Sequence, residues 1–437
     1  MARIGLTCPE MSGHLNPTCA LGRELHLRGH EVTFFGLRDA EDHVHNAGLA
    51  FHPIGEREFP QGSWRTTYAE LGRLQGLRAL QSTIQLYKRS TRVFMRELPE
   101  ALRTHEMDGM VVDQTSLAGA AVADYLNLPF VSLACALMMN SEPGIPPMVS
   151  PWMYRDHWTA RLRNRVGDYL FQQATRGIPR LINRYRRQWN LPLYKSREDT
   201  FSPFAQIAQA PREFDFPREA LPAVFHYTGP LHTPESRPDV PFPYEKLNGK
   251  PLLYASLGTL QNRIGHIFQT IVDACQGLEL QLVLSIGGGD AGNLQNLPDS
   301  AIVVDFAPQL ELLRRADLAI THAGMNTVME ALSQGVPLIC LPVTNDQPAV
   351  AARVAWTQTG TTLPLKSLAA TNLREAIQRL LTQDIYQHRA RQMQVAIEQA
   401  GGLERAADIV ESAVFTGKPV LAPFQPTPEK KLLAVAQ

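Results

Sequence analysis

Short apolar runs alternate with helix-like segments along most of this chain, and this alternation limits the folds that it can adopt. In the first half the runs are RIGLTC, EVTFFGL, LAFHPIG, DGMVVD and PFVSLA. In the second half they are PLLYASLG, LQLVLSIG, AIVVDF, DLAITH and VPLICLP. Turn residues or helical periodicity bound each run, which is typical of βαβ units around a buried parallel sheet. The sequence therefore predicts an α/β fold with two doubly wound, Rossmann-like domains.

A proline-rich, charged segment separates the two series. Residues 229–250 read GPLHTPESRPDVPFPYEKLNGK, with little apolar periodicity, and are predicted to be a linker. A chain of 437 residues is also long for a single core. We predict an N-terminal domain over 1–228, a second domain over 251–405, and a C-terminal helix with a Pro-rich surface tail over 406–437. Two such domains facing each other would leave a cleft at the carboxyl ends of their strands, where doubly wound sheets bind ligands.

Charge and cysteine content restrict the class of partner. Forty-two Lys and Arg balance 42 Asp and Glu, so there is no general attraction to nucleic acid or to anionic lipid. The cysteines form no CxxC pair, and neither a disulfide framework nor a zinc site is expected. The start, MARIGLTCPE, lacks the apolar stretch of a signal peptide, and the longest apolar runs are too short for a bilayer. We expect a soluble, cytoplasmic protein.

The segment DLAITHAGMNTVMEALSQG is predicted to form an anion site at a strand–helix junction. DLAIT is interpreted as a strand, HAG as a tight turn and MNTVMEALSQG as a helix. Gly324 lets the backbone approach a ligand closely. Asn326 or Thr327 is predicted to cap the helix, whose N–H groups and positive dipole end favour an anion. His322 adds a donor there.

Asp346 and Gln347 follow VTN and begin the next predicted helix. With a diphosphate at the first helix, these side chains would be free to hydrogen-bond a polyhydroxylated group. The motifs APQ, THAGMNTVMEAL, GVP and NDQ, in this order, resemble the donor-binding signature of family 1 glycosyltransferases, which use nucleotide-diphosphate sugars. NDQPAVAARV is similar to the bacterial branch that includes zeaxanthin and macrolide glycosyltransferases. GHLNP and VVD are similar to the first domain of the same family.

The resemblance implies the two-domain GT-B fold and a set of donor-binding residues. The implied residues are Ser256, Gln309, His322, Gly324, Asn326, Thr327, Glu330, Asp346 and Gln347. His322 would contact the diphosphate, supported by Asn326 and Thr327, and Ser256 would reach the phosphates from the first strand of the second domain. Glu330 would hold the ribose hydroxyls. Taken singly, His322 and Glu330 could equally be a helix-entry residue and a solvated helix charge.

Further members of this set would contact the base and the sugar. Gln309 would lie near the uracil, and Asp346 and Gln347 would contact the sugar hydroxyls, with glutamine resembling the glucose-preferring version. Phe306 stands where plant members have a tryptophan that stacks on uracil, so the identity of the nucleobase in the donor stays open. No cofactor is implied, because the UDP-sugar is a co-substrate. Without a DxD triplet a metal-clamped diphosphate is not expected, and helix N-termini and His322 would meet the leaving-group charge.

His14, in GHLNP, is the candidate for a catalytic base. Sugar transfer to a hydroxyl requires removal of a proton as the oxygen attacks, and histidine titrates near neutral pH. Asp113 ends DGMVVD and is predicted to lie at the same sheet edge, where it would orient the imidazole. The same residues also fit a role without catalysis. Gly13 and Pro17 would then form the turn and the helix start, and Asp113 would cap a helix near Ser116.

Three other features are less specific. Residues 154–189 carry nine arginines interleaved with aromatic residues, as in a solvated helical face, which we favour, or in a surface that docks on anionic lipid. GGGDAG at 287–292 matches GxGxxG but lacks a following helix and is predicted to be a turn. An apolar acceptor pocket is predicted from residues that could equally be core. They are Met11, Trp64, Met138, Met139, Met148 and Trp152.

These features predict an inverting, metal-independent glycosyltransferase. It would move a sugar, by our reading glucose, from a UDP-sugar to a hydroxyl of a small hydrophobic acceptor, with His14 as base and Asp113 as its partner. Carotenoid, other terpenoid, polyketide and flavonoid acceptors stay open. Two alternatives fit the same donor site, namely a non-hydrolysing epimerase and a non-catalytic nucleotide-sugar-binding protein.

Overall fold

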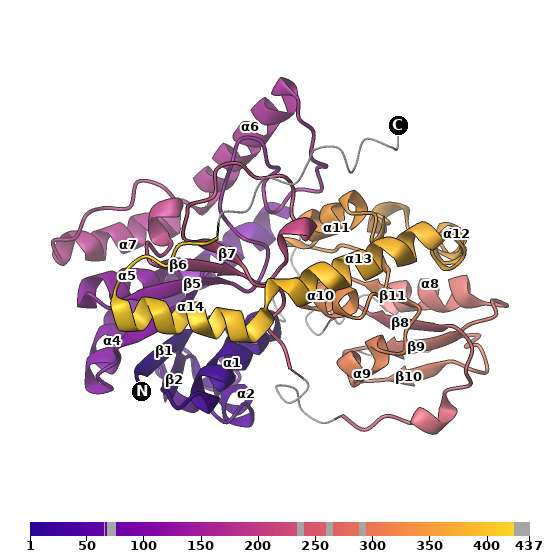
Figure 1. Cartoon of the computed structure of the whole chain (residues 1–437), viewed down its shortest axis with the longest axis horizontal. Helices are drawn as coiled ribbons and strands as arrows, with labels where there is room; N and C mark the ends of the chain where they lie inside the picture. Colours follow the sequence, from indigo (N-terminus) through magenta and orange to yellow (C-terminus); the bar gives the residue numbers. More distant parts are fainter. Residues whose placement is uncertain (65, 68–75, 234–239, 259–264, 288–293, 424–437) are drawn as a thin grey trace.

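Two parallel sheets, each covered by helices, form the body of the protein (Figure 1). The computed structural model describes residues 1–64, 66–67, 76–233, 240–258, 265–287 and 294–423. The GGGDAG run therefore lies, apart from Gly287, outside the described residues. Among the described helices, none has both the length and the apolarity needed to cross a membrane.

The first sheet has seven strands in the order β3-β2-β1-β4-β5-β6-β7, all paired in parallel. Its strands are β1 (Arg3–Thr7), β2 (Glu31–Gly36), β3 (Ala50–Pro53), β4 (Gly109–Asp113), β5 (Phe130–Ala134), β6 (Ala205–Ala208) and β7 (Phe225–Tyr227). The helices of this half are α1 (Ser12–Leu27), α2 (Glu41–Asn46), α4 (Gly76–Thr104), α5 (Leu117–Leu126), α6 (Trp158–Thr175) and α7 (Gly177–Gln188). Most residues of the central strands are buried, which explains their continuous apolar runs.

The second sheet has six strands in the order β10-β9-β8-β11-β12-β13, again all parallel. Its strands are β8 (Leu252–Ser256), β9 (Gln281–Ser285), β10 (Ile302–Val304), β11 (Leu318–Thr321), β12 (Leu338–Cys340) and β13 (Gly360–Thr362). Its helices are α8 (Gly265–Cys275), α9 (Gln309–Leu313), α10 (Met325–Ser333), α11 (Gln347–Trp356), α12 (Ala370–Thr382) and α13 (Asp384–Ala400). Short 3-10 helices occur along the whole chain. They are η1 (Arg38–Ala40), η2 (Glu198–Thr200) and η3 (Arg212–Phe214) in the first half, η5 (Tyr244–Lys246) between the two sheets, and η6 (Leu365–Ser367) in the second half.

The strand order reverses beside β1 and β4 in the first sheet and beside β8 and β11 in the second. Ligands of doubly wound sheets bind at such reversal points, outside the carboxyl ends of the strands. The predicted α/β fold with two doubly wound sheets is confirmed. The sheets lie on either side of residues 229–250 in the chain, while the domain boundaries inferred from sequence stay a prediction.

The last helix, α14 (Gly402–Thr416), returns from the second half and packs on the first sheet (Figure 1). Its buried face joins the core that contains β1, β4 and β5. Arg28 pairs with Asp408 and Glu411, and buried His30 contacts Glu411 at 2.8 Å. Past α14, the backbone N–H of Val420 donates to the Phe204 carbonyl, so the described start of the tail lies along the first half.

Candidate active site

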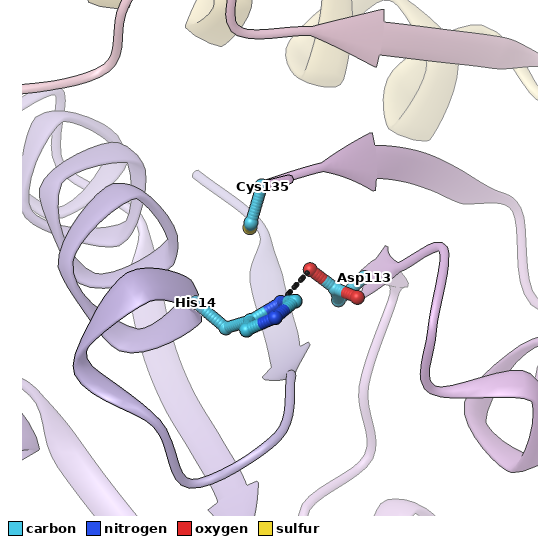
Figure 2. Close-up of side chains that lie close together, drawn as sticks. All are labelled: His14, Asp113 and Cys135. Atoms are coloured by element: carbon cyan, nitrogen blue, oxygen red, sulfur yellow. Dashed lines mark hydrogen bonds and ion pairs between the residues drawn. The ribbon is translucent and has the colours of Figure 1, made fainter. Parts of the chain in front are cut away.

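His14 and Asp113 meet at the carboxyl edge of the first sheet. Asp113 ends β4, and His14 lies in the first turn of α1, which follows β1. Because β1 and β4 pair in parallel, their carboxyl ends share one edge. His14 Nδ1 lies 2.9 Å from Asp113 Oδ2, and the two side chains are 13% and 1% exposed (Figure 2). The pairing predicted from the sequence is thus present.

The start of α1 differs from the prediction. The helix begins at Ser12 and contains Pro17, which we had expected at its first turn. Proline has no backbone N–H, so the Gly13 carbonyl has no helical donor. That carbonyl instead accepts a hydrogen bond from Asn326 Nδ2, in α10 of the second half, at 3.1 Å. Pro17 therefore leaves the carbonyl of Gly13, next to His14, available as a hydrogen-bond acceptor for Asn326 of the second half.

The Asp113 carboxylate is held on both oxygens. Oδ1 accepts hydrogen bonds from the backbone N–H of Thr115, at 2.7 Å, and from its hydroxyl, while Oδ2 faces His14. The expected capping role is wrong, because Ser116 occupies the N-cap position of α5. Burial raises the pKa of Asp113, but His14 and the surrounding donors outweigh it, so the pKa is lowered overall.

The interaction with Asp113 shifts the pKa of His14 in the opposite direction, upward. Burial lowers the pKa of His14, but the attraction of Asp113, with smaller contributions from Asp346 and Glu10, leaves the pKa raised. The Nδ1–H donates to the carboxylate, which leaves Nε2 as the nitrogen able to take a proton. This geometry would allow His14 to act as a general base with Asp113 as the orienting carboxylate.

Cys135 completes the cluster and was missed by sequence reasoning. Its signal was its place directly after β5, whose carboxyl end lies beside that of β4. The possible ligand atoms of His14, Asp113 and Cys135 lie within 4.8 Å of one another (Figure 2). Burial, followed by the charge of Asp113, raises the pKa of the Cys135 thiol well above its usual value. The thiol also lies 3.3 Å from the Thr18 hydroxyl, so Cys135 is a hydrogen-bonding neighbour at the buried end of this cluster.

Glu10, a further residue missed from the sequence, lies one turn before His14. Its Oε1 accepts a hydrogen bond from the backbone N–H of Leu37 at 2.9 Å. Burial raises the pKa of Glu10 to about 7, against the opposing effect of that hydrogen bond. A carboxyl group that titrates near neutrality therefore stands beside the His14–Asp113 pair.

In the second half, the junction of β11 and α10 has the tight backbone that the sequence predicted. Ala323 adopts φ 65°, a left-handed conformation that is strained for a residue with a side chain. The His322 ring packs on two glycines: a Cβ at Gly258 would lie 2.8 Å from Cε1, and one at Gly324 would lie 2.5 Å from Nε2. Burial lowers the pKa of His322 to about 4, so the ring is neutral. Its buried Nδ1 has no hydrogen-bond partner among the described residues.

The predicted caps of α10 are wrong. Gly324 occupies the N-cap position and makes no side-chain cap, so no side chain closes the first turn. Asn326 and Thr327 lie inside that turn. Asn326 Oδ1 accepts a hydrogen bond from Gln209 Nε2 at 2.7 Å, while its Nδ2 donates to the Gly13 carbonyl. This amide thus joins the helix that carries His322 to the helix that carries His14, a contact that sequence reasoning missed together with Gln209.

Glu330 is not a solvated helix charge, because it is only 1% exposed. Gln309, at the start of α9, donates to Glu330 Oε2 through Nε2. The Tyr254 hydroxyl donates to Gln309 Oε1 at 3.1 Å. The structure thus brings together Gln309 and Glu330, which the sequence had placed in one site. Phe306, after β10, is half exposed.

Asp346 takes the N-cap position of α11, as the sequence predicted. Its Oδ2 accepts a hydrogen bond from the backbone N–H of Leu137, in the first half, at 3.0 Å. Gln347 Oε1 accepts from the backbone N–H groups of Val343 and Thr344, which stabilises the turn before α11. Ser256 ends β8 next to Thr321 of β11, at the same strand edge.

Comparison with known proteins decides the family. Residues 56–398 match the family described as UDP-glucoronosyl and UDP-glucosyl transferase. The chain belongs to this family. A zeaxanthin glucosyltransferase of Pantoea ananas is 36% identical over 97% of this chain and 98% of that protein. One of Pseudescherichia vulneris is 32% identical over 95% and 98%.

Solved structures agree on the fold. The crystal structure of the glycotransferase of kitacinnamycin has a TM-score of 0.76 and 22% identity, covering 94% of this chain and 98% of that one. The predicted GT-B fold and the predicted family are confirmed. The protein is therefore a UDP-glycosyltransferase, which takes a nucleotide sugar as donor and a small molecule as acceptor.

The acceptor residues predicted for this glycosyltransferase are not brought together as a group. Three of them, Met138, Met139 and Met148, line one narrow cavity past the end of β5. Met11 occupies the N-cap position of α1. Trp64 packs on Phe59 in the core, and Trp152 lies under the Arg163 guanidinium.

Proposed function

We propose that this UDP-glycosyltransferase is an inverting, metal-independent enzyme that moves glucose from UDP-glucose to a hydroxyl of a small hydrophobic acceptor. The observation that carries the proposal is the His14–Asp113 pair, joined to the donor side by the Asn326–Gly13 hydrogen bond. A base in the first half thereby lies next to the helix expected to hold the leaving group. Domains over 1–228 and 251–405, with a linker at 229–250, would bind acceptor and donor respectively.

The chemistry follows from these two groups. Nε2 of His14 takes the proton of the acceptor hydroxyl as that oxygen attacks the anomeric carbon. The bond between the anomeric carbon and the diphosphate breaks on the opposite face, so an α-linked donor yields a β-glycoside. The uncapped N-terminus of α10 and the neutral His322 would stabilise the departing UDP.

Donor recognition is proposed for the residues of the second half. The buried Glu330 carboxylate would accept hydrogen bonds from the ribose hydroxyls, while Gln309, which holds it, would lie near the base. Asp346 and Gln347 would contact the sugar, and glutamine favours glucose. Ser256 and Thr327 lie at the ends of the elements that would face the phosphates.

A hydrophobic acceptor is supported by the relatives. Two of them, at 36% and 32% identity, carry the name zeaxanthin glucosyltransferase. The methionines beyond β5 offer adaptable apolar contacts. Because such an acceptor partitions into lipid, the proposal includes a cytoplasmic enzyme that contacts a membrane through residues 154–189.

The test is purified protein with UDP-glucose and a panel that includes zeaxanthin, other hydrophobic alcohols and phenols, with and without EDTA. A β-glucoside formed equally well in EDTA supports the proposal. Conversion of the UDP-sugar without an acceptor would instead indicate an epimerase. A raised melting temperature with UDP-glucose but no turnover would indicate a binding protein.

The pH profile tests the role of Asp113. His14 acts as a base only when neutral, so kcat/KM should fall as the pH drops below its raised pKa. Asp113→Asn removes the charge that raises this pKa, while burial still lowers it. We expect the acidic limb to move to lower pH and the plateau of kcat/KM to fall by about 10²-fold or more.

The profile is measured from about pH 5 to about pH 9, around the ordinary titration range of histidine. Asp108→Asn is the matched control, because Asp108 lies at the other end of β4 and contacts Arg3. An acidic limb that stays in place in Asp113→Asn would show that the carboxylate does not set the pKa of the base.

A further inference from the structure

The outer face of α6 exposes large apolar side chains from its first residue to Leu170. They are Trp158 (69% exposed), Leu162 (53%), Val166 (50%), Tyr169 (61%) and Leu170 (60%). Their spacing of three and four residues puts them on one side of the helix. The opposite side packs on the protein, where Asn164 donates to the Pro143 carbonyl and Gly167 touches Trp152. Figure 1 shows that α6 projects from the body of the first half.

Positive charge is concentrated in α6 and α7. Residues 154–189 contain nine arginines and two acidic residues, whereas the whole chain has zero net charge. Seven of the arginines are exposed: Arg155, Arg161, Arg165, Arg176, Arg180, Arg184 and Arg187. The other two serve the fold, since Arg163 stacks on Trp152 and Arg186 pairs with Asp124. Arg155, Arg161 and Arg165 lie in or next to the part of α6 that carries the exposed apolar row, and Arg161 also pairs with Asp156. Arg176 follows the end of α6, and the remaining three lie in α7.

We propose that this face of α6 docks on an anionic lipid membrane, with its axis along the surface. The apolar row would enter the boundary between headgroups and acyl chains, and the arginines would pair with lipid phosphates. Charge complementarity selects this partner, because a neutral bilayer or a second copy of this arginine-rich face would leave the cations unpaired or repelling. A continuous exposed apolar row is otherwise uncommon on a soluble protein.

The edge of α6 that carries Arg165, Asp168 and Tyr169 connects this surface to the candidate active site. Arg165 and Tyr169 line an open cavity with Ser141 and Glu142, and Asp168 lines both this cavity and the narrow one that holds Met138 and Met139. Residues 138–142, which line these cavities, come shortly after β5. Cys135, the residue directly after β5, lies beside Asp113. Docking would place the bilayer next to the cavity that holds Met138 and Met139. It rests on the proposed function, whose membrane contact it assigns to one face of α6 and to anionic lipid, and it is tested without the sugar-transfer reaction.

The experiment is flotation of the full chain with vesicles of phosphatidylcholine alone or mixed with phosphatidylglycerol. We expect binding to the mixed vesicles only, weakened by salt. Leu162→Ser/Val166→Ser/Leu170→Ser should abolish it. Arg155→Gln/Arg161→Gln, at two exposed arginines that line neither cavity, should lower the partition coefficient about tenfold or more. The control Ile385→Ser/Val395→Ser removes exposed apolar residues of α13 and should bind like the wild type.

Unchanged melting temperatures would show that the variants fold. Equal binding to both vesicle types, or unchanged binding of the α6 variants, would overturn the proposal. So would a lipid-free dimer that the triple variant abolishes, because the face would then be a self-association surface. Transfer to a water-soluble acceptor, measured in parallel, should be the same in all variants. If it is absent throughout, the proposed function fails while flotation still decides the docking.

Discussion

Replacing His14 with alanine is expected to lower kcat for sugar transfer by about 10²–10⁴-fold. The variant loses the only group of the His14–Asp113 pair that can accept a proton at neutral pH, because the pKa of Asp113 is lowered. The acceptor hydroxyl would then attack while still protonated. The affinity for UDP should change little, since the proposed donor residues lie in the second half.

The measurements are initial rates with a saturating acceptor and a titration with UDP. His26→Ala is the matched control, because His26 lies near the other end of the same helix and contacts only the His30 carbonyl among the bonds described for its ring. Near-normal transfer by His14→Ala would mean that another group is the base. Loss of UDP binding together with activity would point to damage beyond the base.

Replacing Asp215 with alanine is expected to lower the free energy of unfolding by about 3–5 kcal/mol. Asp215 follows η3 and is buried between two arginines from different halves. Its Oδ2 accepts from Arg218 Nε at 2.6 Å, and its Oδ1 accepts from Arg353 Nε, in α11, at 2.8 Å. The Tyr227 hydroxyl also donates to Oδ2. The variant would leave two buried guanidinium groups without a counter-charge.

Equilibrium denaturation by urea, followed by circular dichroism, measures this loss. Glu279→Ala is the control, because its ion pair with Lys250 is largely exposed and should contribute nothing measurable. A similar small change in both variants would contradict the prediction. Arg353→Met is a second variant, which should also destabilise the protein because it removes one of the two partners and part of the contact between the halves.

Low pH should weaken the ion pairs of Asp215 with Arg218 and Arg353 in the wild type. Burial raises the pKa of Asp215, but Arg218 and Arg353 outweigh it and lower the pKa to about 2. A carboxylate whose folded pKa lies below its unfolded value stabilises the protein above about pH 4, and that contribution is lost as the pH falls towards 2. Asp215→Ala should lack this part of the acid transition.

Much of the fold and of the candidate site could be predicted from the sequence because the signals are local. Continuous apolar runs, turn residues and helical periodicity mark parallel strands and their helices without knowledge of the tertiary structure. Strand ends share one edge in such sheets, which is why His14 and Asp113 could be paired from their positions alone. The ordered motifs of the second half indicated the family for the same reason, since each occupies a short stretch.

Contacts across the tertiary structure could not be predicted in this way. Cys135 and Glu10 join the His14–Asp113 pair only once the strands are packed. Trp64 has the same apolar character in a core as in a pocket, and only its packing on Phe59 decides between them. Its assignment to the acceptor pocket rested on composition, which does not distinguish these environments.

The sequence by itself determined the two parallel sheets, the family and the identity of the proposed base and donor residues, because each depends on a local pattern or on strand ends. Only the tertiary structure decided how the halves meet: Asn326 on the carbonyl that Pro17 frees, Asp346 on Leu137, and α14 on the first sheet. These contacts join residues hundreds of positions apart. Their geometry depends on the packing of whole elements, which no local pattern in the chain encodes.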